Sequence, residues 1–395
     1  MAVSSICDRM LCTGCGTCKQ ICPKSAVSMK ENEEGFLYPV IGRACIECGL
    51  CIRKCPVNTD NEKNKAHFYM GWHKDKEVLK SSSSGGLFTS LSKYVFDRDG
   101  VVFGAVKNKD NQIVHTYAES MEELEPLKLS KYYQSDPGNS YSQVKSFLLQ
   151  DRMVLFSGTA CQIAGLKNYL GKEYEKLLTM DVLCHGAASK KVVDAFIRSK
   201  EKQFHKRIID YHFRVKEKER GWYNGGGTRM HLFFEDGTSV VEPGRYDTYF
   251  LGFNNNYFLR ESCYRCKYCG TERISDFTLA DYWRCEHKEI SEEQLKLGVA
   301  LILANSVRSM DILNEISDSI VLYEIDGTNA IAHNRALVKP QERPSIRDEF
   351  FHMLDSEDYD RIIHSQFRNL FRKRKVKQFL HHFMPSTLYN KCFND

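Results

Sequence analysis

Eight cysteines near the N-terminus are spaced as ligands of iron–sulfur clusters. Residues 12–23 read CTGCGTCKQICP and residues 45–56 read CIECGLCIRKCP, so one pattern of four cysteines and a proline occurs twice. Both runs follow C-x2-C-x2-C-x3-C-P, the spacing of bacterial two-cluster ferredoxins, in which the fourth cysteine of each run reaches the other cluster. We therefore predict two [4Fe–4S] clusters with these ligands: Cys12, Cys15, Cys18 and Cys55 for the first, and Cys45, Cys48, Cys51 and Cys22 for the second.

Zinc and disulfide bonds are the alternatives for so many cysteines. Zinc sites prefer separated C-x2-C pairs to runs of four. Disulfides form mainly in exported proteins, and the first residues, MAVSSICDRM, lack the basic region and apolar region of a secretory signal. We therefore predict a cytoplasmic protein that binds iron, in which Cys7, outside both runs, is a free thiol.

Further cysteines lie in the rest of the chain. Cys161 in FSGTACQ and Cys184 in VLCHG each follow a predicted buried strand, and ligands bind where the strands of an open α/β sheet end. Cys161 also begins a predicted helix, where we expect a lowered thiol pKa. ESCYRCKYCG adds three cysteines and LADYWRC one more. Two alternatives stay open: a zinc knuckle on residues 263–269, or a third cubane with the ligands Cys161, Cys184, Cys263 and Cys266.

The elements that must position these cysteines change in type along the chain. Residues 26–41 read as a strand, a turn and a second strand between the two cysteine runs. From about residue 66 to 200, strands and helices alternate, which predicts a mostly parallel α/β sheet. The segments RIIDYHFRV, TRMHLFFEDGTSVVE and SDFTLADYW look antiparallel, and the Asp236-Gly237 pair is typical of a hairpin turn.

We therefore expect an α+β protein of four regions. These are a two-cluster ferredoxin-like domain at 1–60, an α/β region at 66–200, a mixed α/β region with the additional cysteines at 201–340, and a basic helical tail at 345–395. The tail fits either a solvated helix or one that contacts a membrane surface or a protein complex. No apolar run is long enough to span a membrane, and the basic residues are too dispersed for a nucleic-acid partner.

Two further features fit either a binding role or a structural one. SSSSGGLF at 81–88 leads into a predicted helix, whose free N–H groups can bind a phosphate, although a serine-capped turn explains the segment as well. His185, next to Cys184, fits either a contact to a flavin or substrate or a hydrogen-bonded structural histidine.

The order of the short motifs resembles a known family. The double ferredoxin run is followed by SSGG, KYYQS, GTACQ, LCHG, GW, CYRC and SDFTLADYW. This order is similar to the family of the beta subunits of coenzyme F420 hydrogenases and dehydrogenases, and in particular to bacterial members found with polysaccharide genes. The resemblance covers nearly the whole chain and weakens after about residue 305. Members of the family bind FAD in the α/β domain beside an iron–sulfur cluster, so the resemblance implies that residues 66–200 bind FAD.

The resemblance also implies roles for single residues. It places the FAD phosphates and their surroundings at these positions: Ser84, Gly85, Gly86, Lys131, Gln134 and Ser135. It favours the third cubane, with the four ligands named above, over a site that uses Cys269 or Cys285. Arg214 and Trp222 fit either contacts to flavin or substrate or structural packing. The chain departs from the family pattern at Ala160, where a proline is usual, and at Arg284, where a glycine is usual.

Together these features predict an oxidoreductase, an iron–sulfur flavoprotein. Electrons from a ferredoxin or similar donor would pass through the clusters and FAD to a small organic substrate, because flavin exchanges either one or two electrons. The bacterial relatives point to polysaccharide or nucleotide-sugar metabolism. One alternative is an oxidoreductase that uses the deazaflavin coenzyme F420. Another is a non-catalytic electron-transfer subunit of a larger redox complex.

Overall fold

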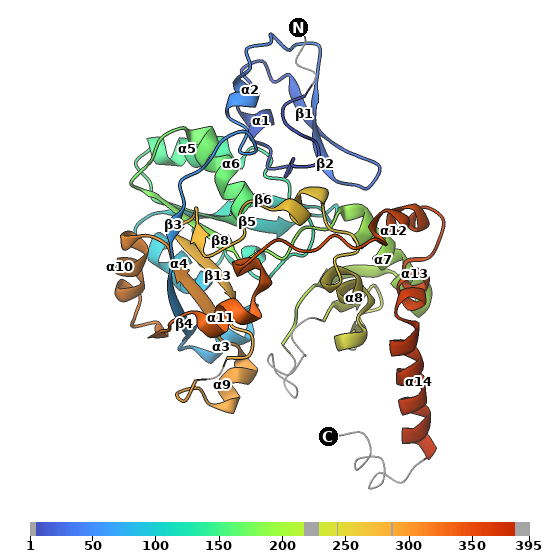
Figure 1. Cartoon of the computed structure of the whole chain (residues 1–395). Helices are drawn as coiled ribbons and strands as arrows, with labels where there is room; N and C mark the ends of the chain where they lie inside the picture. Colours follow the sequence, from blue (N-terminus) through green and yellow to red (C-terminus); the bar gives the residue numbers. More distant parts are fainter. Residues whose placement is uncertain (1–4, 217–228, 243, 286, 384–395) are drawn as a thin grey trace.

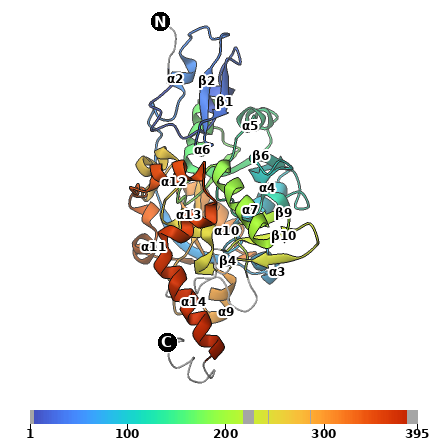
Figure 2. The ribbon, with the colours of Figure 1, turned by 90° about the vertical axis from the view of Figure 1, so that its right-hand side faces the viewer.

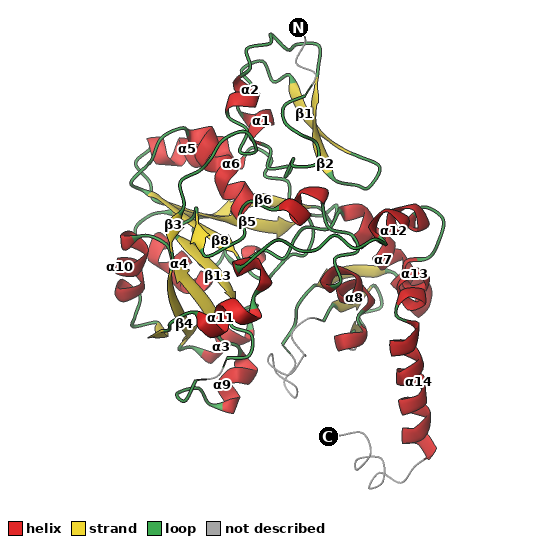
Figure 3. Ribbon diagram, in the orientation of Figure 1, coloured by secondary structure: helices red, strands yellow, loops and turns green. Residues whose placement is uncertain are grey.

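A computed structural model describes residues 5–216, 229–242, 244–285 and 287–383 of the chain. Figure 1 shows three parts: an N-terminal unit above a central sheet, the sheet with its helices, and a helical part beside it. Figure 3 shows that helices and strands are mixed through most of the chain, so the larger part is of mixed α/β type rather than the segregated α+β type. Within the described residues, no helix combines the length and the apolar character that a membrane crossing needs.

The N-terminal unit contains a hairpin and two short helices. Strand β1 (Val27–Glu31) pairs antiparallel with β2 (Leu37–Ile41), as the strand–turn–strand pattern predicted. Helices α1 (Thr17–Gln20) and α2 (Leu50–Arg53) lie inside the two cysteine runs. Each helix follows a glycine with a left-handed backbone, φ 77° at Gly16 and φ 68° at Gly49. Glycine adopts this conformation without strain, so the sequence can form the tight loops that group the thiols.

The central sheet has eight strands in the order β15-β4-β14-β13-β8-β7-β5-β6. Their bounds are β4 (His67–His73), β5 (Val101–Lys107), β6 (Ile113–Ala118), β7 (Val154–Thr159), β8 (Leu177–Val182), β13 (Phe277–Asp281), β14 (Ala300–Ala304) and β15 (Ile320–Glu324). Strands β5, β7, β8 and β13 pair in parallel, and antiparallel strands extend both edges. The sheet is therefore parallel at its centre only.

The segment SDFTLADYW needs a correction, because it forms β13 and pairs in parallel with β8 as well as antiparallel with β14. The chain leaves the sheet at the end of β8 and crosses back to the opposite edge, where β8 begins, before it enters β13. Parallel pairing requires such a long connection. Strands β13, β14 and β15 come from the range 201–340 and join strands of the range 66–200. These two ranges thus share one sheet.

Helices cover both faces of this sheet. On one face, α4 (Leu87–Phe96) and α10 (Val307–Glu315) share a buried apolar cluster with Val102 and Leu155. On the other face, α5 (Ser140–Leu149) and α6 (Ala160–Leu170) share a cluster with Val101 and Phe156. Neighbouring residues of one strand point to opposite faces, so the uninterrupted apolar runs VVF and VLF fill both layers.

A further set of helices and strands forms a third apolar core beside the sheet. They are α7 (Lys190–Phe204), β9 (Ile208–His212), β10 (His231–Phe234), β11 (Ser239–Val241), α8 (Thr248–Asn254), α12 (Arg347–Leu354) and α13 (Tyr359–Gln366). Strands β9, β10 and β11 form an antiparallel sheet, as predicted. The turn at Asp236-Gly237 is the expected hairpin, in which the Thr238 amide donates to Asp236 Oδ1. From α13, the basic helix α14 (Arg368–Phe383) extends away from the rest of the molecule (Figures 1 and 2).

The smaller elements complete the chain. They are β3 (Asn64–Lys65), α3 (Lys76–Lys80), β12 (Glu272–Arg273), α9 (Glu292–Leu297), α11 (Thr328–His333) and 3-10 turns at Glu125–Leu127, Gly244–Tyr246, Glu261–Arg265 and Arg335–Leu337. Strand β3 lies in the polar segment after the ferredoxin unit and pairs with β12. This pairing ties the segment to the region directly after Cys269.

Candidate functional site

The first cysteine group consists of Cys12, Cys15, Cys18 and Cys55. All four side chains are at most 8% exposed. Burial raises the pKa of Cys18, and the negative charge of the other three raises it further, so the four thiols lie within short electrostatic reach of one another. Cys7 lies beside them, and its hydrogen bonds with Cys12 and Cys55 raise the pKa of Cys7. Cys7 was predicted as a free thiol outside the motif, and its place is against this group.

The second cysteine group consists of Cys22, Cys45, Cys48 and Cys51. These four side chains line one small cavity together with Pro23, Ile46 and Gly49. Cys48 is exposed to solvent, and the Ala26 amide donates a hydrogen bond to the Cys22 sulfur at 3.2 Å. The fourth cysteine of each run thus lies beside the other run, and the assignment of these thiols as cluster ligands stays a prediction.

The third cysteine group consists of Cys161, Cys184, Cys263 and Cys266. Strands β7 and β8 are parallel neighbours, with Thr159 opposite Val182, so the residues that follow them emerge at the same edge of the sheet. Cys161 is in the first turn of α6, and Cys184 follows β8. Burial raises the pKa of Cys184, and the nearby thiols Cys263, Cys161 and Cys266 raise it further. Four thiols from three separate segments thus share one neighbourhood.

The thiol pKa of Cys161 differs from the one expected from the sequence. A helix N-terminus was expected to lower its pKa, but burial raises it to about 12. The Thr159 hydroxyl, 3.1 Å from the Cys161 sulfur, acts in the opposite direction without reversing the effect. Desolvation disfavours the thiolate more than one turn of helix stabilises it, so a nearby positive charge is needed to favour the ligand form.

The other two cysteines of this region lie at different places. A hydrogen bond between Cys269 and Cys266 raises the pKa of Cys269, so Cys269 adjoins the third group. Cys285 is buried in another apolar core, with its sulfur 3.9 Å from the Met70 sulfur. Across the described ranges, no three Cys, His, Asp or Glu side chains meet closely enough to hold one metal ion. Because Cys269 contacts Cys266 and Cys285 lies in another core, Cys269 remains an alternative ligand for the third group and Cys285 does not.

The first and third groups are in contact through α1 and α6. A Cβ atom added at Gly165 on α6 would lie 2.6 Å from Thr17 Oγ1 and 3.2 Å from Cys15 Cβ. The Tyr141 hydroxyl bridges the same two elements, since it donates to the Cys15 carbonyl at 2.8 Å and to the Gln162 carbonyl at 3.1 Å. Glycine at position 165 permits this close approach of the ferredoxin unit to the helix that carries Cys161.

Tyr268 lies between these two groups. Burial raises the pKa of its hydroxyl, and the thiols Cys161, Cys15, Cys266 and Cys55 raise it further. Two of these thiols belong to the first group and two to the third. Sequence reasoning missed Tyr268 and Tyr141, and it also missed Arg260, which contacts the first group. Tyr268 and Arg260 flank the CYRC motif, which was the available signal, but only the fold reveals their contact with residues 12–55.

The predicted flavin residues divide between two places. Gly86 is the left-handed residue before α4, with φ 80°, and a Cβ atom at Gly85 would lie 2.6 Å from the Gly71 carbonyl oxygen. The Ser84 carbonyl accepts from Lys216 at 2.7 Å. Burial lowers the pKa of Lys131 to about 7 and that of Lys216 to about 7. The start of α4 is therefore accompanied by two partly buried lysines.

Gln134 and Ser135 lie away from this start. Gln134 donates to the Thr13 carbonyl at 3.2 Å, and the Ser135 hydroxyl accepts from Gln162 of α6 at 2.9 Å. The chain passes from Ser130, whose amide donates to Ser83 Oγ, toward the ferredoxin unit. Four extended residues span roughly 13 Å, which explains how one short motif reaches both places.

The residues predicted to contact flavin or substrate have structural partners. His185 Nε2 donates to the Phe253 carbonyl at 3.2 Å, its ring packs on Phe253, and burial lowers its pKa. Arg214 pairs with Asp281 at 2.8 Å, and both side chains are buried. Trp222 lies outside the described residues. The contacts of His185 are those of a hydrogen-bonded structural histidine.

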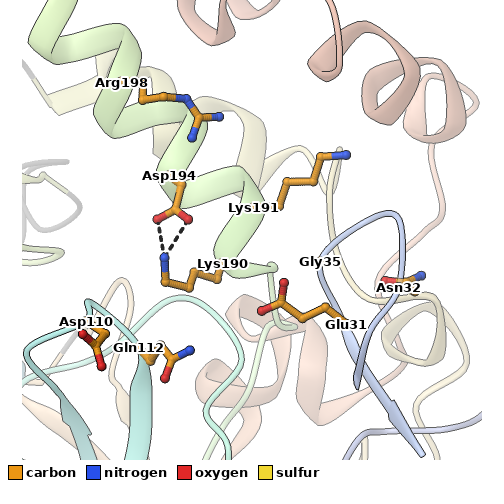
Figure 4. A pocket seen from close by; sticks show the side chains of 9 residues that line it. All are labelled: Glu31, Asn32, Gly35, Asp110, Gln112, Lys190, Lys191, Asp194 and Arg198. Carbon is orange, nitrogen blue, oxygen red and sulfur yellow. Dashed lines mark hydrogen bonds and ion pairs between the residues drawn. The ribbon is translucent and has the colours of Figure 1, made fainter. Parts of the chain in front are cut away.

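A polar cavity of about 390 Å³ lies between the β1–β2 hairpin and α7. Figure 4 shows its lining, with Lys190 paired to Asp194 and the other charged side chains directed around the opening. The lining residues are Glu31, Asn32, Gly35, Asp110, Gln112, Lys190, Lys191, Asp194 and Arg198. None of the predicted site residues lines this cavity.

Comparisons with known proteins match two parts of the chain to known families. Residues 151–329 match the family described as the C terminus of the coenzyme F420 hydrogenase/dehydrogenase beta subunit. Residues 11–60 match a 4Fe-4S dicluster domain. An uncharacterized ferredoxin of Methanocaldococcus jannaschii is 40% identical over 58 residues, which cover 15% of this chain and 75% of that protein.

Two larger proteins are also similar. The F subunit of the F(420)H(2) dehydrogenase of Methanosarcina mazei is 25% identical over 201 residues, 46% of this chain and 55% of that protein, so the match spans about half of its length. A chain of the F420-reducing [NiFe] hydrogenase complex from Methanosarcina barkeri matches with a TM-score of 0.47 and 15% identity, over 71% of this chain and 92% of that chain. The family expected from the order of motifs is confirmed, whereas the bacterial, polysaccharide-linked type stays a prediction. Residues 151–329 are thus homologous to the C-terminal part of coenzyme F420 hydrogenase/dehydrogenase beta subunits, and residues 11–60 form an N-terminal 4Fe-4S dicluster domain.

Proposed function

We propose that the protein is an iron–sulfur flavoprotein oxidoreductase that moves electrons between a ferredoxin-type donor and a small organic substrate. The carrying observation is that twelve cysteines form three groups of four, of which the first and third are in contact through α1 and α6. Bound [4Fe–4S] clusters would supply one-electron transfer, and FAD would supply the exchange between one and two electrons. The role in polysaccharide or nucleotide-sugar metabolism stays a prediction from the resemblance.

The donor side of this pathway would be the second group. Cys48 is exposed, Ile46 beside it is 57% exposed, and the basic residues Lys24, Arg43 and Arg53 are exposed around the same loops. These three cations outnumber Glu47, the exposed carboxylate of the same loop. The excess of positive charge around an exposed apolar residue fits a small acidic electron carrier, because complementary charge steers such encounters. The buried first group would then connect this surface to the third group.

The start of α4 would hold the anionic part of FAD. Lys131 is partly buried, and its ammonium group donates only to main-chain carbonyls among the described residues. A buried cation is costly without a counter-charge, and a helix N-terminus provides N–H groups for phosphate. Lys216 and Gly86 lie at the same segment. Gln134 and Ser135 are not part of this proposed phosphate site, because they contact the ferredoxin unit and α6.

Anaerobic purification with iron, sulfide and flavin analysis tests this proposal. About twelve irons and one FAD per chain are expected for three cubanes. About eight irons without flavin would leave only the ferredoxin unit, and zinc in place of iron would overturn the proposal for all three groups. Replacement of Lys131 by Met should weaken FAD retention without loss of iron, since Lys131 contacts none of the cysteine groups in the described contacts.

A second candidate function is a subunit that only transfers electrons within a larger complex. It is favoured by the similarity to one subunit of an F(420)H(2) dehydrogenase and by the structural partners of His185. The purified chain should then reduce no organic substrate or coenzyme F420 with an artificial donor, although its clusters would still be reduced. Absorbance of F420 in the same assay distinguishes a deazaflavin-linked enzyme.

A further inference from the structure

Arg260 is a buried cation that lies directly before the third cysteine group. Its side chain is 1% exposed. It precedes the 3-10 turn Glu261–Arg265, and its carbonyl accepts from the Cys263 amide at 2.9 Å. The position is 248 residues from Cys12 in sequence, yet the guanidinium contacts the loop that carries Cys12. It therefore connects two distant parts of the chain.

The guanidinium uses every nitrogen at this junction. Nε donates to the Cys12 carbonyl at 2.7 Å, one terminal nitrogen donates to Gln134 Oε1 at 2.9 Å, and the other donates to the Leu37 carbonyl at 2.9 Å and to the Cys12 sulfur at 3.7 Å. The Tyr38 ring lies 4.1 Å from the guanidinium carbon. The group is thus fixed against the ferredoxin unit.

What distinguishes this arginine is its lack of an acidic partner. In the part of the chain that the structure describes, no carboxylate forms an ion pair with Arg260. The other deeply buried arginines differ, since Arg347 pairs with Glu34 at 2.7 Å and Arg273 pairs with Asp181 at 2.8 Å. Burying an unpaired charge costs several kcal/mol. The fold therefore needs a negative group at this place that is not a carboxylate.

The thiols of two cysteine groups fill that role. The Cys12 sulfur lies 3.7 Å from a terminal guanidinium nitrogen of Arg260, and the Cys263 amide donates to the Arg260 carbonyl at 2.9 Å. Cys12 belongs to the first group and Cys263 to the third. A cluster with four thiolate ligands carries net negative charge, so two such clusters side by side repel each other unless a cation lies close by.

We propose that Arg260 is the shared counter-charge of the first and third clusters and that it raises the reduction potential of the first cluster most. This inference rests on the proposed function, because it requires [4Fe–4S] clusters at both groups. Reduction adds one electron from the donor and one negative charge, with no proton taken up. The cation at Cys12 stabilises that added charge, so electrons that arrive at the second group move on to the first.

Potentiometric titration of the reconstituted protein, followed by electron paramagnetic resonance, tests the inference. Each signal is assigned by removing one group at a time, with Cys48→Ser for the second group and Cys184→Ser for the third. In Arg260→Gln, we expect a large negative shift of the first midpoint potential, a smaller negative shift of the third, and no shift of the second. Arg260→Lys keeps the charge and should restore much of the loss.

Gln134→Glu provides an independent variant that retains the size of the side chain and the whole of Arg260. A carboxylate at this position would pair with the guanidinium and neutralise it, so the first potential should again fall. Arg347→Gln is the matched control, because it removes a buried arginine that already has carboxylate partners, and the first potential should stay unchanged. If Arg260→Gln does not fold, Gln134→Glu still decides the question.

The possible failures are distinguishable. Variants with full iron content and an unshifted first potential would overturn the role of Arg260 while leaving the proposed function intact. Wild-type protein without iron at the first or third group would instead overturn the proposed function. An equal shift of all three potentials would also contradict the inference, because none of the described contacts of Arg260 involves the second group, whose potential would then report a general loss of structure.

Discussion

The first and second cysteine groups have the same spacing in sequence and opposite environments in the fold. The first is buried between α1 and α6, beside Tyr141 and Arg260. The second lines a small cavity at the outer end of the ferredoxin unit, where Cys48 is exposed. The loop of each group accepts a hydrogen bond from an arginine: Arg53 of the same run donates to the Cys48 carbonyl at 3.0 Å, and the distant Arg260 donates to the Cys12 carbonyl at 2.7 Å. Spacing thus specifies which thiols are grouped, whereas burial specifies how strongly the surrounding protein groups affect the properties of those thiols.

The largest effect of this difference should be on stability. Cys15→Ser places a hydroxyl in a site that is 8% exposed, and Cys48→Ser places one at the solvent. Because a hydroxyl is costly to bury in place of a thiol, we expect Cys15→Ser to lower the free energy of unfolding by about 3 kcal/mol more than Cys48→Ser does. Anaerobic urea unfolding of the two holoproteins measures the difference. Equal losses would mean that burial of the first group does not contribute to the free energy of unfolding.

The contact between α1 and α6 gives the next effect. Gly165→Ala brings a methyl group to 2.6 Å from Thr17 Oγ1, which forces the ferredoxin unit away from α6. We expect a loss of about 2 kcal/mol in unfolding free energy, as for other overpacked sites, and a weaker magnetic interaction between the first and third clusters. Gly42→Ala is the matched control on the hairpin, since its Cβ atom would lie no closer than 3.4 Å to the Ala26 carbonyl.

A control that loses as much stability as Gly165→Ala would show that the hairpin is as tightly packed as the helix contact. Gly165→Ala with an unchanged magnetic interaction would contradict the proposed proximity of the first and third clusters. Either result would mean that the first and second cysteine groups do not differ because of the packing around them.

The sequence predicted local chemistry better than long-range contacts. The cysteine runs, the hairpin at 236–237 and the strands before Cys161 and Cys184 all follow from periodicity and spacing, because they depend on neighbouring residues. The parallel pairing of β13 and the raised pKa of Cys161 do not follow from them, since both depend on how distant segments pack. Arg260 and Tyr268 were missed for the same reason: the cysteines of the first group that they approach are more than 200 residues away in sequence.

Burial also changes the chemistry of a lysine, and this predicts a pH effect. Burial lowers the pKa of Lys131 to about 7, from an ordinary value of 10.5. Between these pH values the unfolded chain binds the proton and the folded chain does not, so the free energy of unfolding should rise as pH increases from about 7 to about 10.5. Lys131→Met should reduce this slope, measured by urea unfolding of flavin-free protein.

An exposed lysine provides the control for that slope. Lys24→Met should leave it unchanged, because Lys24 is exposed beside the second group. If Lys131→Met leaves the slope unchanged as well, the ammonium group is charged in the folded protein and is paired with an anion. In that case the anion paired with Lys131, and not the burial of the lysine alone, would determine its charge in the folded protein.

The smallest expected effect concerns Arg53, the exposed counterpart of Arg260. Water and salt screen an exposed charge, so Arg53→Gln should shift the potential of the second cluster by much less than about 59 mV, the value of a tenfold change in a one-electron equilibrium. Arg260→Gln should shift the first cluster more in the same titration. Raising the salt concentration should reduce the Arg53 effect and leave the Arg260 effect in place, because only the buried charge is protected from ions. A larger effect at Arg53 would mean that distance to the sulfurs, rather than burial, sets the two potentials apart.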